Sequence, residues 1–166
     1  MRVHYPGMIK HNPEIYKEQN LYLQEQSYTC GPSSIKNVQR ILGAPESDIE
    51  EIITLTKATP QKGSANKNIV QALQTLNFET QEHTNATIAD MQKYLHAGHA
   101  IITNYINALH DVGHYAAIDS ITDTHVHLRD SSIGLVQIKH KHFERLWHDM
   151  SGNASQWFVA IKKKGE

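Results

Sequence analysis

The sequence predicts an α+β fold in which an N-terminal helical layer packs on a C-terminal antiparallel β-sheet. Between about residues 30 and 98, apolar side chains recur at the three- and four-residue spacing of amphipathic helices. Between about 99 and 163, they gather instead in short β-branched or aromatic runs separated by turn residues. The 166 residues, 39% of them hydrophobic, suit one packed domain, and no repeat or linker divides the chain.

The first twenty residues differ from the rest. They are polar and interrupted by Pro6, Gly7 and Pro13, which predicts an irregular arm over residues 1–20. The single domain is therefore expected to span residues 21–166 and to open with a short extended piece at 21–23.

The first predicted helix follows Pro32, a residue that suits the first turn because its missing N–H is not needed there. Gly43 and Pro45 end it, and the apolar residues between them have helical spacing: Ile35, Val38, Ile41 and Leu42. Cys30, the only cysteine, is thus expected at or beside the N-terminus of a helix.

Three more helices are predicted before the strands. Ser47 to Glu50 has the form of a capping box and opens the second helix. The third begins near Ser64 and carries Ile69, Leu73 and Leu76 on one face, and the fourth spans 87–98 and ends at Gly98. Strands are expected at 99–106, 114–121, 125–130, 135–139 and 155–163, with a short helix at 141–150 before the last.

Composition excludes several classes of binding partner and predicts where in the cell the protein resides. Lys and Arg number 16 against 17 Asp and Glu, so the net charge of −1 provides no field for nucleic acid or an anionic membrane. No apolar run approaches the roughly 20 residues that span a bilayer, so direct membrane insertion is not expected. One cysteine cannot form an internal disulfide, and the chain does not open with an export signal, which predicts a cytoplasmic protein.

Cys30 lies in a setting that favours nucleophilic chemistry. A cysteine attacks as its thiolate, and the N–H groups and dipole of a helix N-terminus stabilise that anion, as does a nearby imidazolium. A lone cysteine is otherwise often a small buried hydrophobe. The neighbours of Cys30 are polar and turn-like, which favours the nucleophile: Tyr28, Thr29, Gly31, Pro32, Ser33 and Ser34.

A thiolate nucleophile needs a base and a group that orients the base. His114 begins one predicted strand and Asp130 ends the next. If these strands form a hairpin that turns at 122–124, His114 and Asp130 become neighbours, and Asp130 can accept from one imidazole nitrogen while the other faces sulfur. His110 remains a competing base, and Asp130 could also be a simple turn residue.

Together these residues resemble the double-glycine-leader peptidases, the papain-like cysteine peptidases that process bacteriocin precursors. The resemblance covers about residues 21–158 and rests on "QEQSYTCGP" before a helix, "GHY" at the start of a strand, and an Asp sixteen residues after that His. It implies a papain-like fold and a triad of Cys30, His114 and Asp130. It also implies that Gln24, six residues before the cysteine, forms the oxyanion hole.

Gln24 is chemically reasonable in that role, because a side-chain amide and the Cys30 N–H could together stabilise the oxyanion. Gln26 is a rival, since alternation along an extended segment places both side chains on one face. A metal site made of His114, His125 and His127 is a less favoured alternative, because strand histidines at this spacing are more often surface residues.

The function expected is a cysteine peptidase that needs no cofactor and cleaves a peptide or small protein, such as a leader ending in small residues. Members of the family are usually fused to a membrane exporter, so an exporter would be a partner in trans. Two alternatives stay open: acyl transfer or amide hydrolysis on a different substrate by the same triad, and a catalytically silent peptide-binding module. Retention of Cys30, His114 and Asp130 favours an enzyme.

Overall fold

The computed structural model describes residues 2–4, 20–107, 112–150 and 155–165. Its helices are α2 (Cys30–Leu42), α3 (Ile49–Thr56), α4 (Asn66–Thr75), α5 (Ile88–His96) and α6 (His140–Leu146). Its strands are β1 (Arg2–His4), β2 (Phe78–His83), β3 (Ala100–Asn107), β4 (Val112–Ile121), β5 (His125–Asp130), β6 (Gly134–Lys139) and β7 (Phe158–Lys163). Among the described residues, no helix is both long and apolar enough to cross a membrane.

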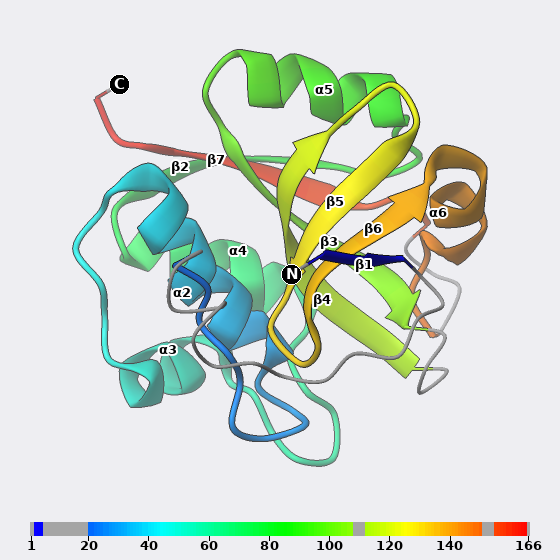
Figure 1. The fold of residues 1–166 in the computed structure, drawn as a ribbon. Coiled ribbons are helices and arrows are strands. Elements are labelled where there is room, and N and C mark those ends of the chain that lie inside the picture. Colours follow the sequence, from blue (N-terminus) through cyan, green and yellow to red (C-terminus); the bar gives the residue numbers. More distant parts are fainter. Residues whose placement is uncertain (1, 5–19, 108–111, 151–154, 166) are drawn as a thin grey trace.

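All seven strands form one sheet in the order β1, β6, β5, β4, β3, β7, β2 (Figure 1). Neighbouring strands are antiparallel except β1 and β6, which are parallel. The hairpin of β4 and β5 predicted from the sequence is present, and β3 pairs with the other edge of β4 so that Asn104 lies opposite Tyr115. The expected α+β class is confirmed.

Successive side chains of the central strands enter two separate cores, because the side chains of a strand alternate between the faces of a sheet. Helices α2, α3 and α4 pack on one face, over a core that includes Ile102, Ala117 and Val159. Helices α5 and α6 pack on the other, over a core that includes Ile101, Ala116 and Phe158. The helical layer is therefore divided, with α5 on the face opposite the first three helices (Figure 1).

Two strands are absent from the sequence prediction. Phe78 is the only apolar residue of β2, and half of the strand's residues are exposed at the edge of the sheet, so it shows no apolar alternation. Residues 2–4 form β1 within the arm expected to be irregular, while residues 5–19 of that arm lie outside the described residues.

The predicted capping box at Ser47 to Glu50 is wrong. Ser47 does not cap α3, because the Gln39 side chain engages both its N–H and its hydroxyl at 3.0 Å. The N-cap is Asp48, whose side chain makes no capping hydrogen bond. A true capping box opens α5, where Thr87 and Asp90 bond to each other's backbone N–H.

The extended segment before α2 is fixed from both sides. The Asn37 side chain accepts from Tyr22 N–H at 2.8 Å and donates to Tyr22 O at 3.1 Å. The Gln24 N–H donates to Ser131 O at 2.9 Å, directly after β5. This segment therefore ties the middle of α2 to the end of the hairpin that carries Asp130.

Candidate active site

Cys30 is the first residue of α2 and is partly exposed. The next residue, Gly31, is fully enclosed: a Cβ built on it would lie 2.7 Å from Ile69 Cδ1 and 3.2 Å from Ser64 Oγ. Glycine at 31 thus lets the N-terminus of α2 approach α4 and the loop before it. The chain places a thiol at a helix N-terminus, as the sequence predicts.

His114 and Asp130 lie together in the protein interior. His114 Nε2 is 2.7 Å from Asp130 Oδ1, and the exposed fractions of the two residues are 5% and 0%. A side-chain hydrogen bond joins His114 to Cys30. Because Asp130 engages Nε2, the ring nitrogen that faces sulfur is Nδ1. The hairpin thus brings His114 and Asp130 together, and the packing of α2 adds Cys30.

The carboxylate of Asp130 is held by several donors. Oδ1 accepts from the Ser132 backbone N–H at 2.9 Å and from the Ser132 hydroxyl at 2.6 Å, and Oδ2 accepts from the Tyr105 hydroxyl at 2.5 Å. Burial raises the pKa of Asp130, but the His114 charge and the hydrogen bonds from His114, Ser132 and Tyr105 lower it to about 2. Asp130 is therefore a fixed anion beside the imidazole.

The thiol and the imidazole shift each other's ionisation. Burial raises the pKa of the Cys30 thiol, but the charge and hydrogen bond of His114 and a bond from the Tyr115 backbone lower it below its ordinary value. Burial lowers the pKa of His114, but the charges of Asp130 and Cys30 and hydrogen bonds to both raise it well above its ordinary value. The lowered pKa of Cys30 and the raised pKa of His114 both favour a thiolate beside an imidazolium at neutral pH.

Gln24 is half-buried on the loop before α2. Its Oε1 accepts from the Ser131 hydroxyl at 2.7 Å, and its Nε2 donates to Gln26 O at 2.7 Å and, more weakly, to Ser27 O at 3.4 Å. The amide group is therefore fixed in orientation. The rival Gln26 has an exposed side chain and uses its carbonyl oxygen to hold Gln24 and Thr29.

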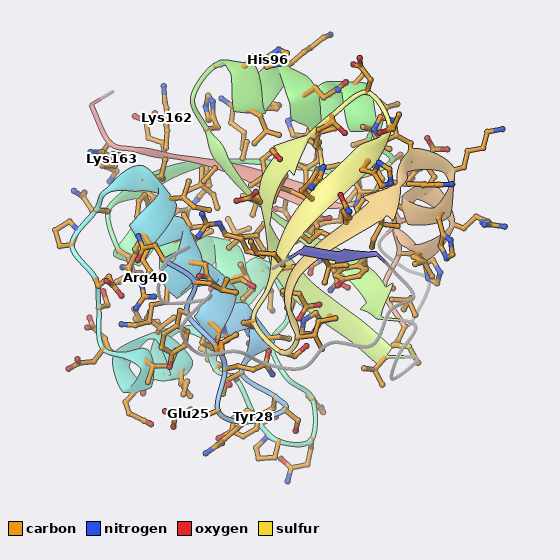
Figure 2. The ribbon with its side chains drawn as sticks, viewed as in Figure 1. Glu25, Tyr28, Arg40, His96, Lys162 and Lys163 are labelled. Carbon is orange, nitrogen blue, oxygen red and sulfur yellow. The ribbon has the colours of Figure 1, made fainter. Side chains whose placement is uncertain are left out.

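A cleft of about 690 Å³ adjoins Cys30. Its walls come from the loop before α2, the loop before α4, and strands β3 and β4, with Tyr28, Ser64, Asn104 and Gly113 among the lining residues. Figure 2 shows Tyr28 near Glu25, on the loop that leads into α2. Among the described residues that line the cleft, Cys30 is the only one of the four predicted site residues.

The remaining alternatives from the sequence are a second base and a metal site. His110 lies outside the described residues. The rings of His125 and His127 are 6.1 Å apart, and within the described part of the chain no three His, Cys, Asp or Glu residues form a group that could hold a metal ion.

Several residues of the site were not recognised in the sequence. Tyr105 has the spacing of a core residue in a strand, and Ser131 and Ser132 have the composition of an ordinary turn. The one available signal is position, because both serines directly follow Asp130 and short hydroxyl side chains often bond to nearby groups in turns.

Comparisons with known proteins bear on the family and the fold of the chain. The sequence matches the Peptidase C39 family over residues 18–151. It is 24% identical over 129 residues to an uncharacterized protein of Methanothermobacter thermautotrophicus, covering 76% of this chain and 82% of that protein.

Three solved structures share the fold. The peptidase domain of ComA from Streptococcus, a bi-functional ABC transporter involved in quorum sensing, has a TM-score of 0.71 at 18% identity over 87% of this chain and 98% of its own. A double glycine motif protease from an AMS/PCAT transporter, in complex with the leader peptide, has a TM-score of 0.66 at 15% identity. The match covers 87% of this chain and 91% of that one. A putative C39-like peptidase from Bacillus anthracis has a TM-score of 0.68 at 12% identity, over 88% of this chain and 95% of that one.

The family match covers most of the chain, and the fold agrees along nearly its whole length. The resemblance to double-glycine-leader peptidases is thereby confirmed. This chain belongs to the peptidase C39 family and is a cysteine peptidase.

Proposed function

We propose that this chain cleaves a peptide bond that follows small residues, with Cys30 as nucleophile, His114 as acid and base, Asp130 as the orienting group and Gln24 in the oxyanion hole. The observation that carries the proposal is the buried 2.7 Å contact of His114 Nε2 with Asp130 Oδ1, next to a thiol at a helix N-terminus. A substrate with a leader ending in Gly-Gly is supported by the leader peptide bound to a protease of the same fold.

In this scheme the Cys30 thiolate attacks the carbonyl carbon, and its proton resides on His114. The negative charge moves to the carbonyl oxygen, where the Cys30 N–H and the Gln24 amide stabilise it. Collapse breaks the C–N bond as His114 protonates the leaving amine. Water then attacks the thioester, gives its proton to His114, and releases the carboxylic acid and the thiol.

The four residues have unequal support. Cys30 lines the cleft, and the interactions of His114 with both partners are fixed. As the first residue of α2, Cys30 has an N–H without an intrahelical acceptor. Gln24 Nε2 directs one proton to Gln26 O at 2.7 Å, and its long contact with Ser27 O leaves the other available to a stronger acceptor such as an oxyanion. A membrane exporter is the partner we expect for a leader-bearing substrate, since solved peptidases of this fold come from transporters.

The test is an intact-mass assay of Cys30 labelling by peptide aldehydes and chloromethyl ketones that end in Gly-Gly or in bulky residues. We expect labelling by the Gly-Gly probes, and loss of peptide cleavage in Cys30→Ala and His114→Ala. Iodoacetamide, which needs no peptide recognition, controls for access to the thiol. Full cleavage by Cys30→Ala would refute the scheme, and labelling by bulky probes alone would refute the specificity.

A further inference from the structure

The wall of the cleft contains a buried hydrogen-bond acceptor that the proposed chemistry does not use. Asn104 lies on β3 and lines the cleft. Its Oδ1 is buried, yet no hydrogen-bond partner for it is found among the described residues. A buried polar atom without a partner costs about 1–3 kcal/mol, so such an atom in a cleft wall needs an explanation.

The orientation of this carboxamide follows from its neighbour Tyr115. The Tyr115 hydroxyl has one proton, and two acceptors lie within its reach, Asn66 Oδ1 at 2.5 Å and Ser64 O at 3.0 Å. The Tyr115 oxygen can therefore only accept from Asn104, with which it forms a side-chain hydrogen bond. The group of Asn104 that faces Tyr115 must be its NH₂, so Oδ1 is directed elsewhere.

Gly113 identifies the space beside this oxygen. Gly113 lines the same cleft, and a Cβ built on it would lie 3.7 Å from Asn104 Oδ1 and 3.4 Å from Met150 Cγ. A peptide that passes over this glycine would come close to Oδ1, which a small rotation of the Asn104 side chain would turn into the cleft. The reacting atoms are near, because Tyr115, which faces Asn104 across the ladder, bonds to the Cys30 sulfur through its backbone.

We propose that Asn104 is a substrate-binding residue whose Oδ1 accepts a backbone N–H of the bound peptide, close to but distinct from the scissile amide. The inference rests on the proposed peptidase function and adds to it a contact that recognises the peptide backbone. A backbone N–H is the fitting donor because the lining of the cleft at Gly113 leaves room for main chain.

The test measures kcat/KM for one cleavable Gly-Gly peptide and for ester analogues in which each backbone N–H other than the scissile one is replaced by oxygen. We expect one ester to lower kcat/KM of the wild type about tenfold, the effect of one neutral hydrogen bond whose buried partner is left unpaired. Asn104→Leu should lower kcat/KM for the parent peptide about as much and show no further loss with that ester.

Two controls separate recognition from damage to the site. Asn104→Leu should react with iodoacetamide at the wild-type rate, because that reagent does not use Oδ1. A Cβ at Gly113 would lie no closer than 3.4 Å to any neighbour, so Gly113→Ala should fold, place a methyl group between Oδ1 and the substrate and reproduce the loss.

The outcomes distinguish this inference from the proposed function. If the wild type cleaves the parent peptide but Asn104→Leu does so equally well, or every ester affects both proteins alike, the contact is refuted and the peptidase function stands. Slower iodoacetamide alkylation of Asn104→Leu would also refute it. If the wild type cleaves no peptide although iodoacetamide labels Cys30, the proposed function fails and this inference falls with it.

Discussion

At the scale of single residues, Asp130 sets the electrostatics of the site. Its carboxylate bonds to His114, Ser132 and Tyr105 and is fully buried. Its charge raises the pKa of His114 and keeps the imidazolium present toward higher pH. The ion pair between Cys30 and His114 should therefore exist over a window that opens below the ordinary pKa of a thiol and closes above the ordinary pKa of histidine.

Asp130→Asn tests this directly. Removal of the carboxylate charge lowers the pKa of His114, so the alkaline limb of kcat/KM should move to lower pH, with a loss at the optimum of about 10²-fold. The measurement is the pH profile of peptide cleavage, with the pH profile of iodoacetamide alkylation as a second readout. An unchanged alkaline limb would show that Asp130 does not control the imidazole.

Ser131→Ala tests how Gln24, the proposed oxyanion residue, is positioned. The Ser131 hydroxyl donates to Gln24 Oε1, and its loss should lower kcat up to about tenfold while KM stays the same. The affinity for a peptide aldehyde should fall in parallel, because the bound aldehyde develops an oxyanion. A double variant with Gln24→Ala should be no worse than Gln24→Ala alone; additive losses would contradict the proposed link.

The sequence contained enough to predict that Cys30 begins a helix and that His114 lies beside Asp130, because a helix start and a hairpin turn are local signals. It did not contain the supporting contacts. Tyr105 meets Asp130 across 25 residues of chain and Ser131 meets Gln24 across 107, so both depend on how the segments pack. Nothing in the sequence indicates the binding role proposed for Asn104, since a polar residue in a strand indicates which face of the sheet it lies on and not whether it binds a ligand.

At the scale of elements, the N-terminus of α2 is positioned by its contact with α4. Gly31 leaves no room for a methyl group beside Ile69, which is fully buried. The position of Cys30, the proposed nucleophile, therefore depends on side-chain volume at an interface of two helices as much as on the polar groups of the site.

Gly31→Ala should lower the free energy of unfolding by about 1–3 kcal/mol, because the new Cβ would lie 2.7 Å from Ile69 Cδ1. Ile69→Val removes that atom and costs about 0.5–1.5 kcal/mol by itself. In the double variant we expect the loss to be smaller than the sum of the single losses, measured by urea denaturation. Strict additivity would show that the two residues do not conflict.

The elements that were predicted correctly share a trait: each has several apolar residues at the regular spacing of a helix or of a strand. The six residues of β2 have one, so β2 forms because β7 offers it an unpaired edge. The position of α5 likewise depends on which face of the sheet is still uncovered, and no pattern within residues 88–96 reports that.

At the scale of the whole molecule, β7 joins the parts of the sheet. It pairs with β3 on one side and β2 on the other, and it contributes Phe158 and Val159 to opposite cores. The indole N–H groups reinforce this region: Trp157 donates to Glu82 at 2.7 Å, and Trp147 donates to Thr103 at 2.8 Å.

A chain that ends after Trp157 should therefore not fold, because both cores lose buried side chains and β2 loses its partner in the sheet. Far-UV circular dichroism and the yield of soluble protein measure this. A chain that ends after Lys164 keeps all of β7 and should match the full sequence. A folded, active product from the shorter chain would show that the sheet does not depend on β7.

The place of β7 in the sheet also has a consequence for synthesis on the ribosome. Cys30, His114 and Asp130 are all translated before Phe158 to Lys163, yet these later residues fill the position between β2 and β3. A nascent chain can thus contain every proposed catalytic residue while its sheet still has a gap. Peptidase activity should consequently appear only after β7 has left the exit tunnel.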